Sequence, residues 1–266
     1  MKSFSNFSLR RIWTLTVHQL YVTRRSLEIF FDIVFFPLIN VVLFGLISQF
    51  VGEGVSNKQY LLLGVLLWEI VTIVQYNITV STMWEVWSHN LTNIFIAPIS
   101  ILEYLLAHIT AGIIKTGSVM VMLSLAAVAF FNFNILDIGV VNLILFAINL
   151  TIFAIWVGIL LLGFIFWFGT RMAAISWGLI FLFQPLTAAF FPLSVLPLWL
   201  QSIAKFFPPT YVFEDARKAL ADEKIFWNSS LRVLLANLVY LVLGALIFKW
   251  LFEKSKQSGQ FARNDL

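Results

Sequence analysis

The chain of 266 residues contains no cysteine and few charged residues. The missing cysteines exclude disulfide bonds, thiolate metal sites and a cysteine nucleophile. Only 11% of the residues are charged, whereas soluble domains carry about a quarter. Hydrophobic residues make up 61% of the chain. This composition indicates an integral membrane protein.

Several motifs for catalysis and nucleotide binding are also missing. No GxxxxGK[ST] sequence occurs, so the chain cannot hold nucleotide phosphates through a P-loop. There is no GxSxG or HExxH motif, and His18, His89 and His108 lie far apart without metal-ligand spacing. We therefore expect this chain to bind no cofactor or metal. Of the function classes, a membrane-embedded enzyme is the least favoured.

Long apolar runs without strand-like alternation predict membrane-spanning helices rather than a β-barrel. A hydrocarbon core about 30 Å thick requires roughly 20 helical residues. Suitable runs fall at residues 29–50, 60–83, 104–130, 140–168, 173–191 and 231–252. No internal repeat and no flexible linker divides the chain. We predict an all-α integral membrane protein with six spans in a single domain, residues 1–266.

Basic residues flank the first and last spans, and this pattern predicts the orientation of the chain. They are Lys2, Arg10, Arg11, Arg24 and Arg25 before the first span, and Lys254, Lys256 and Arg263 after the last. The positive-inside rule then places both termini in the cytoplasm of a multi-pass protein of the cell (inner or plasma) membrane. An alternative with five spans and a cytoplasmic insert stays open because basic residues also lie between the last two spans, at Lys205, Arg217, Lys218 and Lys224.

Residues 1–28 form a candidate amphipathic helix. Apolar residues recur at helical spacing at Leu9, Ile12, Trp13, Val17, Leu20 and Leu27, with Arg10, Arg11, His18 and Arg25 on the opposite face. Such a helix lies in the membrane interface, on the cytoplasmic side here. It is either a simple anchor to membrane lipid or a connecting helix beside a cytoplasmic partner.

A proline-rich insert, residues 192–218, precedes the last span. Its prolines are Pro192, Pro197, Pro208 and Pro209. Proline lacks a backbone donor, so these positions should bound short helices. The run between Pro197 and Pro208 is too short to cross the membrane. We predict an extracellular re-entrant helical hairpin with Trp199 at the interface.

Polar side chains inside the predicted spans are candidates for function, because they are costly in hydrocarbon. Glu69, Thr72, Tyr76 and Thr79 follow i, i+3, i+7, i+10 spacing and form one polar stripe on the second span. Asn40 and Gln184 on other spans complete the candidate pathway residues. Glu69 and Lys115 have similar predicted depths, so they are a candidate buried ion pair, with either a structural role or a role in substrate or proton binding.

The connection at residues 84–100 carries an acidic residue, a short polar helix start and a leucine-rich turn that ends at proline. This segment and the insert resemble the coupling segment and the re-entrant element of type-2 ABC exporter permeases. The Gly-Thr start and flanking arginines usual in that family are absent, so the docking contacts would differ. By resemblance, the residues that couple to an ATPase are Glu85, His89, Asn90, Leu91, Phe95 and Pro98.

The resemblance implies the membrane subunit of an ATP-driven exporter. Two copies of a separate ABC ATPase subunit would carry ATP and Mg, and the permease would form a homodimer or pair with a close paralogue. The cargo would be a hydrophobic drug, a lipid or a lipid-linked glycan, and no nucleic acid is expected as a partner. The alternative is a secondary transporter that uses Glu69 as its mid-membrane carboxylate.

Overall fold

The computed structural model describes residues 7–50, 58–221 and 224–259, and every regular element within these ranges is helical. Five helical segments are long and apolar enough to cross a membrane. They are Leu27–Phe50 (α2, η1 and α3), α4 (Lys58–Trp87), α6 (Ile101–Phe131), α7 (Val140–Phe168) and α11 (Trp227–Gln257). This is the architecture of an all-α, multi-pass membrane protein. Lys2 and Arg263 lie outside the described residues.

The expected span at 173–191 is only partly helical. Helix α8 (Ala173–Leu186) has 14 residues and therefore measures about 21 Å, less than a hydrocarbon core of about 30 Å. It contains Pro185, and the chain leaves helical geometry at Thr187. The run looked longer in the sequence because residues 187–191 are mostly apolar although they are not helical. By length, five segments of the described residues can cross a membrane, and α8 is a shorter apolar helix.

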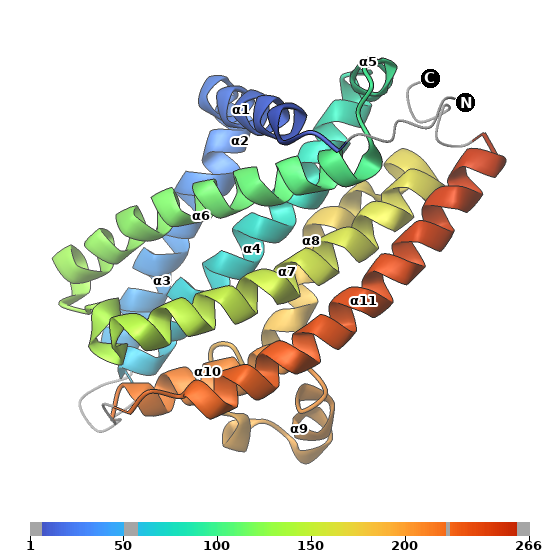
Figure 1. Ribbon diagram of the computed structural model, residues 1–266. Helices are drawn as coiled ribbons and strands as arrows, with labels where there is room; N and C mark the ends of the chain where they lie inside the picture. Colours follow the sequence, from blue (N-terminus) through green and yellow to red (C-terminus); the bar gives the residue numbers. More distant parts are fainter. Residues whose placement is uncertain (1–6, 51–57, 222–223, 260–266) are drawn as a thin grey trace.

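Helix α4 lies in the middle of the bundle, against α7, α6, α3 and α8 (Figure 1). In its most apolar 18-residue window, 89% of the residues are buried, whereas the corresponding windows of the other four segments are 22–44% buried. Helices that are covered on all sides belong to a core. The outer helices shield α4 and leave their own apolar faces exposed.

The short helices gather at the two ends of the bundle. Helices α1 (Leu9–Arg25) and α5 (Leu91–Ile96) lie at one end, together with the C-terminal end of α11 (Figure 1). Helices α9 (Leu198–Ala204) and α10 (Pro208–Ala219) lie at the opposite end. The 3₁₀ turns η2 (Ile135–Ile138), η3 (Gly169–Met172) and η4 (Leu193–Val195) join neighbouring elements.

The prolines of the insert bound short helices, as the sequence predicted. Pro192 precedes η4, Pro197 caps the start of α9, and Pro208 and Pro209 form the first turn of α10. Proline suits these positions because the first backbone N–H groups of a helix have no intrahelical partner.

The first span is irregular near its start. The short helix α2 (Leu27–Phe30) passes into a π-helical turn, η1 (Phe31–Phe35), before α3 (Phe36–Phe50) begins. Pro37 has no N–H to donate to the turn before it, which favours a local departure from α-helical bonding. This turn carries Asp32.

Candidate functional site

A cavity of about 390 Å³ lies between the first span, α4 and α8. It is lined by Asp32, Phe36, Pro37, Asn40, Trp68, Glu69, Thr72, Gln75, Tyr76, Val80, Ser176, Trp177, Ile180, Phe181 and Gln184. The structure thus brings together five of the six residues proposed for the pathway. The sixth, Thr79, does not line the cavity, but its hydroxyl accepts a hydrogen bond from Gln75.

Hydrogen bonds position most of the polar groups of this cavity. Asn40 Nδ2 donates to Glu69 Oε1 at 3.1 Å, and the Tyr76 hydroxyl donates to Asp32 Oδ2 at 2.7 Å. Gln75 Nε2 donates to the backbone oxygen of Ser176 at 3.1 Å, which joins α4 to α8. The sequence analysis missed Asp32 and Gln75, although both lie in apolar runs where a polar residue is costly and therefore a candidate for function.

The second carboxylate oxygen of Glu69 is buried, and no donor from the described residues reaches it. The Glu69 side chain is only 2% exposed. A buried acceptor without a partner costs about 1–3 kcal/mol. The cavity wall therefore contains a carboxylate that is held at one oxygen and has no hydrogen-bond partner at the other.

The rim of the cavity lies on the outer surface of the bundle. Phe36, Trp177 and Phe181 all line it and are all exposed. The cavity consequently opens sideways between α3 and α8, and this chain alone does not close it.

The expected ion pair between Glu69 and Lys115 is absent, because the two residues have other partners. Lys115 Nζ donates to Asn77 Oδ1, whereas Glu69 accepts from Asn40. Membrane depth, which suggested the pair, does not determine which side of a helix a residue occupies. Glu69 faces the first span, whereas Lys115 contacts α4 at Asn77, about 12 Å further along the helix axis, so this prediction was wrong.

A second polar cluster joins α1 to α4 and α6 at the end of the bundle that carries α5. Gln19 Nε2 donates to Glu85 Oε1 at 2.5 Å, and the Tyr104 hydroxyl donates to Glu85 Oε2. His108 Nε2 lies 3.7 Å from the same carboxylate. Glu85 is therefore enclosed by side chains from two neighbouring helices.

Two proposed ATPase contacts are consequently buried. Helix α1 covers Glu85, and Leu91 packs into the bundle core. The sequence analysis predicted that Glu85 and Leu91 contact the ATPase, because the sequence does not show how α1 and the other helices pack around them. Of the other four proposed contacts, His89 and Pro98 are exposed, while Asn90 and Phe95 are half-buried. A partner at this segment would meet its exposed residues rather than Glu85.

Glu103, on α6, holds the beginning of α1 against the bundle through hydrogen bonds. It accepts hydrogen bonds from Arg11 Nη2 at 2.6 Å and from the backbone nitrogen of Ser8 at 2.8 Å. It also forms a capping box with Ser100 at the start of α6. The sequence analysis missed Glu103, although Ser-x-x-Glu before an apolar run is a recognisable capping signal.

Arg217 fixes the insert to the end of α8. Its guanidinium donates to the backbone oxygens of Ala188 and Ala189 and, at 2.8 Å, to Glu214. Glu214 also accepts from the backbone nitrogen of Leu193 at 2.8 Å. Burial lowers the pKa of Arg217, and the adjacent Glu214 carboxylate opposes this effect. The charged side chain of Arg217 thus holds the insert against the end of α8. The sequence analysis had used Arg217 only as evidence on membrane topology.

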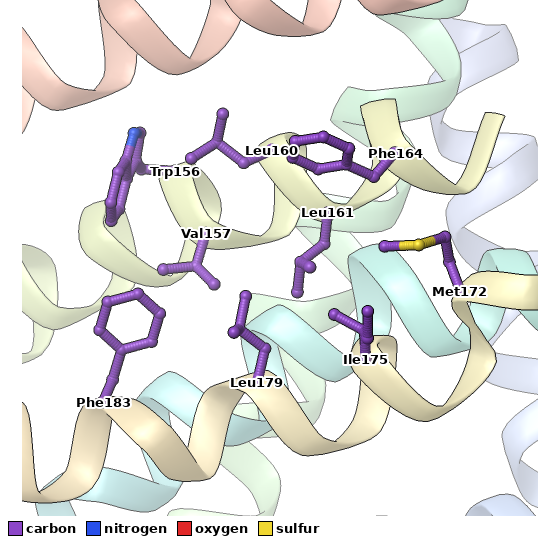
Figure 2. A pocket seen from close by; sticks show the side chains of 9 residues that line it. All are labelled: Trp156, Val157, Leu160, Leu161, Phe164, Met172, Ile175, Leu179 and Phe183. Atoms are coloured by element: carbon purple, nitrogen blue, oxygen red, sulfur yellow. The ribbon is translucent and has the colours of Figure 1, made fainter. Parts of the chain in front are cut away.

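Two other hollows have walls that are mainly apolar. One, of about 180 Å³, lies between α7 and α8 and is lined entirely by apolar side chains, among them Trp156, Leu179 and Phe183 (Figure 2). The other, of about 490 Å³, lies between α6 and α7 and is lined mostly by aliphatic residues. The first hollow leaves α8 loosely packed against α7, since a void removes contacts from the side chains around it.

Among the residues that the structure describes, no cluster of three or more His, Cys, Asp or Glu could hold a metal ion. Neither a protein-family model nor a curated protein matches this sequence.

Proposed function

We propose that this chain is the membrane subunit of an ATP-driven exporter and that a separate ATPase subunit supplies the energy. The observation that carries the proposal is the polar cavity between the first span, α4 and α8, because it opens sideways. A second copy of the chain, or a close paralogue, placed against α3 and α8 would convert this open cavity into an enclosed route. The cargo is hydrophobic or lipid-like, in keeping with the aromatic rim.

Helix α4 provides the link between the ATPase and the route. Its end carries Glu85, which is bonded to α1 and α6, and its middle carries Glu69 and Tyr76. These sites are joined by uninterrupted helix, with about 24 Å between Glu69 and Glu85 along its axis. A displacement of α1 and α5 by an ATPase would therefore move the cavity wall. The hollow behind α8 gives that helix room to move.

In this proposal the end with α1 and α5 faces the cytoplasm, as do both termini. Helix α8 serves as the fifth of six spans, and residues 187–191 extend it towards the opposite side. Helices α9 and α10 form the external re-entrant element, with Trp199 at the interface. Trp199 is exposed, as an interfacial residue must be.

The test begins with purification of the tagged chain from its native membrane. We expect a P-loop ATPase to co-purify and the chain alone to hydrolyse no ATP. Ile96→Asp, on α5, should at least halve the ATPase stimulation by the permease. Leu198→Asp, on α9, is the matched control, because Leu198 is 81% exposed and Ile96 is 77% exposed. ATP hydrolysis by the purified chain, or equal effects of both substitutions, would refute the proposal.

The unpartnered oxygen of Glu69 favours a second candidate, a secondary transporter that couples cargo movement to an ion or proton at this carboxylate. Proteoliposomes that contain only this chain separate the two functions. Cargo accumulation driven by a proton or sodium gradient without ATPase would support the secondary transporter. No accumulation without the ATPase and ATP supports the exporter.

A further inference from the structure

The cavity beside Glu69 has an acidic lining. Two carboxylates, Asp32 and Glu69, are among its described lining residues, and none of these residues is lysine, arginine or histidine. Lys115, the residue that could have balanced Glu69, is bonded to Asn77, further along α4. A buried carboxylate without a counter-charge is costly, so a cation that entered the cavity would remove this cost.

Aromatic rings form much of the cavity wall. Phe36, Trp68, Tyr76, Trp177 and Phe181 contribute rings, and those of Tyr76 and Trp177 lie 6.1 Å apart in an edge-to-face arrangement. Aromatic faces attract cations, particularly where water is excluded. The rings also bury hydrocarbon groups, which a small inorganic ion does not possess.

We propose that this cavity binds a hydrophobic organic cation, such as a lipophilic amine or a quaternary onium ion. The positive charge lies beside the carboxylate of Glu69, which lines the cavity. Asn40 fixes one oxygen of Glu69 and so orients the carboxylate. The identification of this cation as cargo rests on the proposed exporter function, but its binding does not.

The geometry favours this class over other candidate cargoes. A cavity of about 390 Å³ falls within the range of ligand sites, roughly 300–1,000 Å³. An anionic lipid headgroup would face two carboxylates without a basic residue to balance them. A neutral glycan could hydrogen-bond to Glu69 but would leave its charge without a counter-ion.

The experiment measures binding of radiolabelled tetraphenylphosphonium to the full chain in phosphatidylcholine nanodiscs, with empty nanodiscs subtracted. No ATPase is present, so a failure of the exporter assignment does not affect the result. We expect saturable binding to the wild type. Excess unlabelled tetraphenylphosphonium should displace the label.

Three variants test the role of Glu69. Glu69→Gln should weaken binding at least about tenfold, or about 1.4 kcal/mol, whereas Glu69→Asp, which keeps the charge, should retain part of the affinity. Asp137→Asn removes an exposed carboxylate outside the cavity and should leave binding unchanged. Size-exclusion profiles and melting temperatures confirm that each variant is folded. Absence of saturable wild-type binding, or equal affinity of the wild type and a folded Glu69→Gln variant, would overturn the proposal.

Discussion

Asn77 shows how a charged side chain is accommodated inside this bundle. Its side-chain oxygen accepts from Lys115, and its Nδ2 donates to the backbone oxygen of His108. Nδ1 of His108 in turn lies 2.8 Å from the backbone oxygen of Asn77. An amide dipole and neighbouring backbone groups therefore hold the ammonium group, and Lys115 needs no carboxylate in direct contact.

This arrangement predicts which pairs of substitutions interact energetically. The effects of Lys115→Met and Asn77→Ala on the free energy of unfolding should be non-additive by about 0.5–3 kcal/mol, because the residues are in contact. Those of Lys115→Met and Glu69→Gln should add to within about 0.5 kcal/mol. Denaturant unfolding in detergent micelles measures both cycles. Strong coupling between Lys115 and Glu69 would contradict the structure.

At the scale of elements, two glutamates hold α1 against the bundle at separated points. Glu103 holds its beginning through Arg11 and Ser8, and Glu85 holds its middle through Gln19. Leu9, Trp13 and Val17 remain exposed on its outer side. The predicted apolar face is thus divided: Ile12 packs into the bundle, while the exposed residues are available to a membrane surface.

Weakening the first of these points should loosen α1. Glu103→Gln keeps a residue that can complete the capping box but removes the charge that pairs with Arg11, at a cost of about 1–3 kcal/mol. Limited trypsin digestion should then cleave faster at Arg24 and Arg25, which are exposed. Glu253→Gln is the control, because its contact with Lys249 is at the surface and contributes little. Equal digestion rates for the two variants would show that Glu103 does not restrain α1.

The sequence predicted well those elements whose position depends on residues close together in the chain. Hydrophobic length predicted the region 60–83 inside α4, and helical periodicity placed Glu69, Thr72 and Tyr76 on one side. Proline chemistry predicted the starts of α9 and α10. The failures have non-local causes. The end of α8 depends on Arg217 and the insert, and the partners of Lys115 and Glu85 depend on how helices pack.

At the scale of the whole molecule, the two ends of the bundle differ in a way that makes orientation measurable. Helices α1 and α5 occupy one end, and α9 and α10 occupy the other (Figure 1). Ser88 beside α5 and Ser202 in α9 are both exposed. Because the chain has no cysteine, a single serine-to-cysteine substitution introduces a unique thiol.

We expect an impermeant maleimide to label Ser202→Cys in intact cells and Ser88→Cys only in inside-out vesicles. This result follows from the basic residues near both termini, which favour the cytoplasmic side. The two variants control for each other, since the substitution is the same and only the end of the bundle differs. The reverse pattern would invert the proposed topology, and labelling of both from one side would contradict the arrangement in Figure 1.

The burial of α4 also has a consequence for synthesis. The segment emerges from the ribosome before α6 and α7, yet it carries Glu69, Gln75, Asn77 and Glu85, which are unfavourable in lipid until those helices cover them. We therefore expect α4 to enter the bilayer only when its later neighbours arrive. In a chain truncated after residue 100, Ser88→Cys should be labelled from outside the cell, whereas in a chain that extends to residue 168 it should be protected. Protection in both would mean that α4 inserts unaided, and the order of synthesis would then impose no delay on its assembly.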